Sequence, residues 1–401
     1  MESKLKQQYL YILFGVVVAI NFWSYTEESV AIFANRASII LFLLSSILLF
    51  SGNKKNHSED EFHSMVIWTI VTIFLSIIPA YLNFGQSIFI SIRSCMSLSY
   101  GLLFYFLLKK WDFPDIKLIR ILTTVCIIWV ALEIGQQFTY PQILFSSTFS
   151  QLGYVPERMG LYRVYIWGID FVMIIYSLYL GKIISKNRTQ KDVLLFLIMF
   201  IGVLCYCSRK HIFSCLFVFV FSVLNVKGSK KVLYSLIVLA VLAFLYNNFY
   251  VSFLEMSEAA QENQGERDDF VRYISAQYFL FEYSPSALYP LWGGGIPGGQ
   301  GPLYDLMNNL ADKRIYQADV GIIGYYSMVG LLGVFPIILY IYKFVKNWKY
   351  IDDWFRYFFI MKLLLIIFDF WAVWGVGMFA YAVFLYLLEK NIQKNKALNF
   401  V

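Results

Sequence analysis

Basic residues beside apolar runs are the side chains of this sequence best suited to chemistry. Arg209 and Lys210 stand in the segment Ser208-Arg209-Lys210-His211, between two apolar stretches. An ionised side chain at membrane depth is costly, so by default it marks a functional site. Guanidinium binds phosphate through two parallel hydrogen bonds and stays charged. We therefore predict that Arg209 and Lys210 contact a phosphorylated group; the alternative is a pair of helix-end cations that reach lipid headgroups.

Two other polar segments carry further arginines. The first, at about 139–162, contains Arg158 near its end, and Arg163 follows where an apolar run begins. The second runs from 250 to 317 and contains Arg267 and Arg272. We predict that all four help to bind the same anion. The alternatives are a solvated loop charge for Arg158 and a salt-bridged helix face for the pair in the second segment.

The second segment also offers backbone and carboxylate groups. Gly293, Gly294 and Gly295 form a run whose backbone N–H groups can approach an anion closely, although such a run is usually only a turn. Asp319 lies where the segment ends and the next apolar run begins. We predict that Asp319 is a catalytic base, and the competing interpretation is a helix N-cap.

The elements that position these residues are membrane helices. Hydrophobic residues make up 59% and charged residues 15% of the 401 residues, and the mean hydropathy is +0.62. Soluble domains carry about 25% charged residues, so the sequence predicts an all-α polytopic membrane protein with about twelve spans of the length that a bilayer requires. The predicted spans are 8–23, 36–51, 64–82, 87–108, 118–138, 163–184, 192–207, 209–226, 231–250, 318–342, 355–371 and 374–389.

The spans divide the chain into three parts. Residues 1–249 hold nine predicted spans, 250–317 form one large extracytoplasmic loop, and 318–401 hold three more spans and a cytoplasmic tail. Cytoplasmic loops are enriched in Lys and Arg. If the N-terminus is cytoplasmic, the internal segments hold 22 of the 33 Lys and Arg residues. We therefore expect both termini in the cytoplasm, and we interpret the net charge of +7 as a topology signal and not as a nucleic-acid footprint.

No spacing typical of a metal or nucleotide site is present in the sequence. Cys205 and Cys207 form a C-x-C motif without a second pair, which favours small packing residues over metal ligands. The run of three glycines does not follow a strand and open a helix, as a dinucleotide motif requires. We expect neither a metal nor another cofactor.

Four pieces of sequence carry a family resemblance. They are Arg158-Met-Gly-Leu-Tyr-Arg163, Ser208-Arg209 between short spans, Arg272 followed by Gly293-Gly-Gly, and Asp319-x-Gly followed by Gly330-Leu-Leu-Gly333. In this order and in a polytopic frame, they resemble the Wzy-type O-antigen and capsular polysaccharide polymerases, a group that also includes the O-antigen ligases. The motifs are degenerate and fall within residues 150–345, while the topology covers the whole chain.

The resemblance implies a GT-C-like membrane glycosyltransferase of the bacterial cytoplasmic membrane, active at its outer face without a metal or a nucleotide sugar. Donor and acceptor would be undecaprenyl-pyrophosphate-linked oligosaccharides. The growing glycan would move en bloc, with inversion at the anomeric carbon. The lipid bilayer, a chain-length regulator and a flippase are the further partners that the resemblance implies.

Residue roles follow from the same resemblance. Arg209 and Arg272, or Arg267 in place of the latter, would hold the pyrophosphate, whose charge fixed cations stabilise as it leaves. Asp319 would take the proton of the acceptor hydroxyl. The alternates for this base are Asp305 and Glu282. Ligases have a His at the position of Asp319, which favours a polymerase and leaves open whether Asp319 is a base or an orienting group.

Two other functions stay open on the sequence alone. A ligase would deliver the glycan to the lipid A core, and its loss would leave no attached glycan, whereas loss of a polymerase leaves single repeat units. A transporter or flippase of lipid-linked sugar usually carries polar residues at several mid-span positions. This sequence has chiefly Lys362 and Asp369 there.

Overall fold

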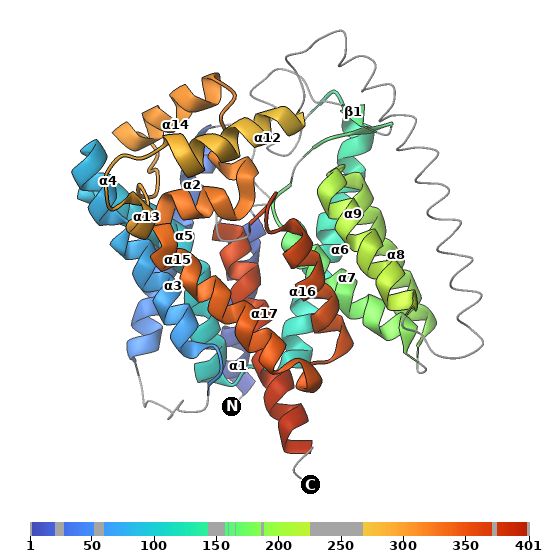
Figure 1. Cartoon of the computed structure of the whole chain (residues 1–401). Helices are drawn as coiled ribbons and strands as arrows, with labels where there is room; N and C mark the ends of the chain where they lie inside the picture. The colour runs from blue at the N-terminus through green and yellow to red at the C-terminus, as the bar shows by residue number, and fades with distance from the viewer. Residues whose placement is uncertain are drawn as a thin grey trace.

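The described part of the chain is almost entirely helical (Figure 1). The computed structural model describes residues 2–20, 28–51, 60–142, 157–158, 160–164, 166–185, 188–224, 268–370 and 375–398. The helices of its first half are α1 (Glu2–Ile20), α2 (Glu28–Phe50), α3 (His63–Leu75), α4 (Ile77–Phe84), α5 (Ile88–Trp111), α6 (Asp115–Thr139), α7 (Ile169–Ile184), α8 (Gln190–Cys205) and α9 (Arg209–Leu224).

Between α6 and α7, strands β1 (Glu157–Arg158) and β2 (Leu161–Tyr162) pair antiparallel. The elements of the second half are α12 (Asp268–Gln277), the π-helix η3 (Tyr278–Glu282), α13 (Tyr289–Trp292), α14 (Pro302–Asp312), the 3-10 helix η4 (Gln317–Val320), α15 (Gly321–Lys346), the 3-10 helix η5 (Trp348–Tyr350), α16 (Asp353–Leu365) and α17 (Gly375–Leu398).

Four helical stretches in the described residues are long and apolar enough to cross a membrane. They are His63–Phe84, Ile88–Trp111, Asp115–Thr139 and Gln317–Lys346. The chain is therefore compatible with a membrane-embedded, all-α protein. Every predicted span except 231–250 overlaps a described helix, while the span at 231–250 lies outside the described residues. Twelve spans thus stay a prediction.

Helix α17 forms the centre of the bundle. Its residues from Gly377 to Glu389 are buried on all sides, as expected for a helix that is apolar around its whole circumference. It packs against α5, which in turn packs against α2. The core of the described residues is therefore made of helices packed against other helices.

Helix α15 is interrupted where the large loop docks on it. Gly330 has φ 64° and ψ −167°, which breaks the helical path, and a Cβ there would overlap the carbonyl of Leu291 in α13. Further on, Pro336 lacks a backbone N–H, so the carbonyl of Leu332 has no helical partner. Trp68 of α3 supplies one, because its Nε1 donates to Leu332 O at 3.1 Å.

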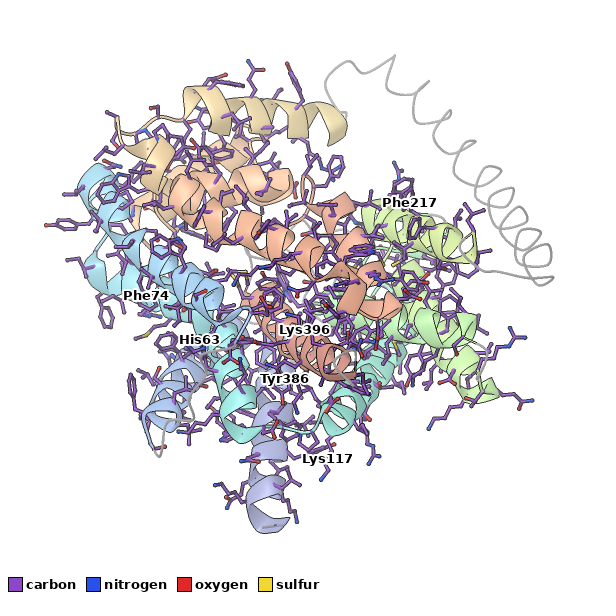
Figure 2. The ribbon with its side chains drawn as sticks, turned by 60° about the horizontal axis from the view of Figure 1, so that its bottom comes forward. His63, Phe74, Lys117, Phe217, Tyr386 and Lys396 are labelled. Atoms are coloured by element: carbon purple, nitrogen blue, oxygen red, sulfur yellow. The ribbon has the colours of Figure 1, made fainter. Side chains whose placement is uncertain are left out.

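The two ends of the bundle differ in content. We call the end that carries α12, α13, α14 and η4 the loop end. Both chain termini lie at the opposite end, the terminus end (Figure 1). Figure 2 turns this second end toward the viewer and labels His63, Lys117 and Lys396 there. The side of a membrane that each end faces stays a prediction.

Candidate functional site

The C-terminal part of α6 holds the hairpin that carries two predicted arginines. Gln137 Nε2 donates to Tyr162 O at 2.8 Å, and Tyr162 N donates to Gln137 Oε1 at 2.7 Å. The Tyr140 ring stacks on Tyr162 with 3.7 Å between centroids. Arg158 lies on β1 of this hairpin, and Arg163 follows β2 and is half-buried. The amide of Gln137 therefore fixes the segment in which both arginines stand.

The start of α9 and the end of α16 meet in a charged cluster. Lys210 Nζ lies 3.1 Å from Asp369 Oδ2 and donates to Phe368 O at 3.1 Å. His211 Nε2 lies 3.1 Å from the same carboxylate oxygen, and its Nδ1 lies 2.8 Å from Ser208 Oγ. His211 is 1% exposed, whereas the Asp369 side chain is 23% exposed. The Asp369 carboxylate is thus held in place and remains reachable.

A second ion pair lies deeper in the bundle. Lys362 of α16 pairs with Asp170 of α7, and Lys362 is 4% exposed. Lys362 also lies within electrostatic range of Asp369, and Arg163 and Asp170 lie within range of Tyr206. The charges of α7, α9, α16 and the segment after the hairpin therefore form one network. Because burying charges costs free energy even when they are paired, such a network among apolar helices marks a functional site by default.

Asp319 lies on η4, close to the end of α16. Ile322 N donates to Ile366 O at 2.9 Å, which joins the start of α15 to the residues just before Asp369. The Asp319 side chain is exposed and has no hydrogen bond or ion pair with another described residue. Val320 occupies the N-cap position of α15, without a side-chain cap bond. The interpretation of Asp319 as the helix N-cap is therefore wrong.

Helix α12 brings Arg272 to the same region. It packs against η4, and Tyr316 N, just before η4, donates to Ser275 Oγ at 3.0 Å. Arg272 is half-buried and lies three residues before Ser275, on the same face of the helix. This face turns toward the segment that carries Asp319. Arg267 lies outside the described residues.

The run of glycines packs the loop onto α15. Gly294 N donates to Ser327 O at 2.8 Å, and Gly295 N donates to Met328 O at 2.9 Å. Gly293 N bonds within the loop, and with φ +76° a Cβ there would overlap the Met328 backbone. The expectation that these N–H groups bind an anion is thus corrected, because all three already donate to carbonyls.

Several of the predicted site residues lie in or beside the charged network. Arg163 and Lys210 belong to the charged network, and Arg209 is exposed at the first turn of α9, directly before Lys210. Asp319 and Arg272 adjoin the network through η4. Lys210 pairs with Asp369, and the exposure of Arg209 leaves its guanidinium accessible from solvent.

The sequence analysis did not single out two buried carboxylates of this region, Glu133 and Asp170. Glu133 of α6 is 0% exposed; its Oε1 accepts a bond from Ile166 N at 3.1 Å, while its Oε2 has no hydrogen-bond partner. Glu133 and Asp170 stand alone in apolar runs. A charged residue that interrupts an apolar run is the same signal that singles out Arg209. Applied to carboxylates, it identifies both Glu133 and Asp170.

No protein-family model matches the chain, and no curated protein matches it. The residues described above are therefore the basis for the function of this protein.

Proposed function

We propose that this protein is a membrane-embedded glycan polymerase. It transfers an oligosaccharide from an undecaprenyl-pyrophosphate carrier to a second lipid-linked repeat unit, at the outer face of a bacterial cytoplasmic membrane. The observation that supports this most is a chain of contacts: α12 packs against η4, Ile322 at the start of α15 bonds to Ile366 after α16, and Lys210 of α9 pairs with Asp369. These elements bring Arg209 and Arg272 to the region of two carboxylates, Asp319 and Asp369.

The reaction needs a bound leaving group and a proton acceptor. The bond between the anomeric carbon and the pyrophosphate oxygen breaks, the acceptor hydroxyl oxygen bonds to that carbon, and the hydroxyl proton goes to a carboxylate. Arg209 and Arg272 hold the pyrophosphate by charge-assisted hydrogen bonds. Because the departing charge is stabilised by fixed cations, the protein needs little further electrophilic assistance.

The two carboxylates suit different roles. Asp369 lies against the Lys210 ammonium and the His211 ring, and a carboxylate beside an ammonium group is a poor proton acceptor. Asp319 is exposed and has no described partner, so an acceptor hydroxyl can approach it. We assign to Asp319 the role of accepting the hydroxyl proton, and to Asp369 the role of positioning the start of α9.

Extension of a defined lipid-linked repeat unit by the purified protein tests the proposal. A polymerase converts single units into a ladder of longer lipid-linked glycans. Transfer only to a lipid A core acceptor would identify a ligase instead. Absence of any new glycosidic bond, with both acceptors present and the protein folded, would refute a glycosyltransferase function.

A transporter of lipid-linked sugar is the second candidate. The buried pair of Lys362 and Asp170 favours it, because charges inside apolar helices often line a substrate path. In sealed vesicles, a transporter moves the intact lipid-linked unit across the bilayer without changing its length. Translocation of the unit without extension would therefore show that the protein is a transporter and not a polymerase.

A further inference from the structure

A polar pocket lies at the terminus end, where α5 and α17 pack together. Its volume is about 170 Å³, well above the ~30 Å³ that one water occupies in the liquid. Three carboxylates and two ammonium groups contribute to its lining, from Asp60, Asp112, Glu389, Lys109 and Lys390. The pocket therefore carries more negative than positive groups.

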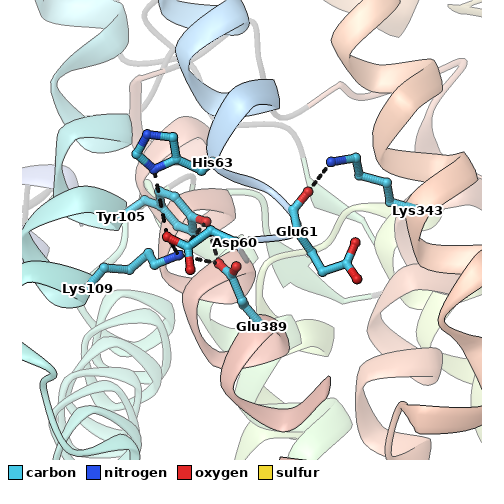
Figure 3. A network of polar contacts seen from close by, with 7 residues as sticks. All are labelled: Asp60, Glu61, His63, Tyr105, Lys109, Lys343 and Glu389. Atoms are coloured by element: carbon cyan, nitrogen blue, oxygen red, sulfur yellow. Dashed lines mark hydrogen bonds and ion pairs between the residues drawn. The ribbon is translucent and has the colours of Figure 1, made fainter. Parts of the chain in front are cut away.

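The two lysines of the pocket already form ion pairs with carboxylates of the protein. Lys109 Nζ pairs with Asp60 and lies 3.0 Å from Glu389 Oε2. Figure 3 shows the Lys109 ammonium between these two carboxylates. Lys390 Nζ lies 3.0 Å from Asp112 Oδ1 and donates to Phe113 O at 3.0 Å. Both ammonium groups are thus committed to protein acceptors, so the pocket is not a site for phosphate.

One buried acceptor in the pocket lacks a partner. Glu389 is 2% exposed, and its Oε2 accepts bonds from Tyr105 and Lys109. Its Oε1 has no hydrogen-bond partner. An unpartnered buried carboxylate oxygen costs free energy, which a ligand with N–H donors would recover. Asp112, whose side chain is 67% exposed, offers a second acceptor at the mouth of the pocket.

The position of the pocket relative to the candidate membrane spans places it at the level of the lipid headgroups. Lys109 stands in the last turn of α5, and Asp112 caps its C-terminal end. Ile88–Trp111 and Asp115–Thr139 are both candidate membrane spans, so the connection between them falls where lipid headgroups lie. The described residues contain no group of three or more His, Cys, Asp or Glu side chains suited to a metal ion. An organic cation of the headgroup layer fits this combination better.

We propose that this pocket binds the primary ammonium of an ethanolamine phospholipid headgroup. The ammonium donates to Glu389 Oε1 and to the Asp112 carboxylate, and its positive charge balances the excess of carboxylates. A choline headgroup has no N–H to donate and leaves Glu389 Oε1 unpaired. The site is independent of the polymerase proposal, because it lies at the opposite end of the bundle.

Equilibrium binding of short-chain phospholipids to the purified full-length protein in detergent tests this site. We expect phosphatidylethanolamine to bind at least about tenfold more tightly than phosphatidylcholine with the same acyl chains, which is the loss of one hydrogen bond to a charged group. Glu389→Gln should abolish the preference. Since that change also disturbs Lys109, Asp112→Asn provides an exposed variant that leaves the buried pairs intact and should weaken the preference.

Asp353→Asn is the matched control, because Asp353 is an exposed acid, 66% exposed, outside the pocket. It should bind both lipids as the wild type does. Equal binding of the two lipids by the wild type, or equal behaviour of Asp112→Asn and Asp353→Asn, would overturn the proposal. Free ethanolamine that binds as tightly as the phospholipid would overturn the lipid as its source.

Discussion

Asp319 and Asp369 differ in their surroundings more than in their chemistry. Lys210 and His211 hold Asp369 from one helix, whereas Asp319 has no described partner. The side chains that hold a carboxylate in place also reduce its tendency to accept a proton. The free carboxylate is therefore the one assigned to proton transfer.

The first prediction is that Asp319→Asn lowers the extension rate by about 10²–10⁴-fold, the usual contribution of a general base. The reason is that an amide cannot take the proton. Asp319→Glu should retain more activity than Asp319→Asn. Initial rates at saturating lipid-linked substrate measure this, and wild-type rates in Asp319→Asn would remove Asp319 from the chemistry.

At the residue scale, single charged residues could be identified from the sequence, but the ion pairs between them could not. Arg209 and Lys210 are conspicuous because they interrupt apolar runs. The pairing of Lys210 with Asp369 joins residues 159 positions apart, which no local pattern records. From the sequence alone we predict that Lys210 contacts the substrate, although its ammonium already bonds within the protein.

At the scale of elements, the break in α15 and the glycine run are one feature. Gly330 interrupts the helix, and the glycines of the loop use the carbonyls just before the break. Local pattern identified the apolar helix and the turn separately. Their docking depends on tertiary contact, so the sequence suggested an anion cradle where the structure has a packing seam.

The second prediction concerns this seam. Gly293→Ala should destabilise the protein by about 2 kcal/mol or more, because φ is positive and the new methyl overlaps the Met328 backbone. Gly299→Ala is the control, since a Cβ there meets nothing within 4 Å. Thermal unfolding in detergent compares the two variants. Equal stability would mean that the loop does not dock as described.

The third prediction concerns the carbonyl freed by Pro336. Trp68→Phe should cost about 1 kcal/mol, the net worth of one hydrogen bond. In a Pro336→Ala background the cost should shrink, because the new backbone N–H can bond Leu332 O. A double-mutant cycle of unfolding free energies measures this coupling. Additive effects of the two changes would contradict it.

For the molecule as a whole, the composition and the spacing of apolar runs were sufficient to predict an all-α membrane protein. Described helices lie at nearly all of the predicted spans, and four stretches meet the length and hydropathy of a membrane crossing. The arrangement of α12 and η4 beside the end of α16 could not be predicted from the sequence, because it depends on packing between distant segments.

The central claim is that arginines of separate elements at the loop end bind a pyrophosphate-linked lipid. Equilibrium binding of an undecaprenyl-pyrophosphate-linked repeat unit to the purified protein tests it most directly. Arg209→Ala and Arg272→Ala should each weaken binding by about 10–100-fold, the loss of charge-assisted hydrogen bonds. Arg188→Ala is the control, because Arg188 is exposed just before α8, at the opposite end of that helix from Arg209, and its binding should match the wild type. Wild-type affinity in both Arg209→Ala and Arg272→Ala would contradict the account.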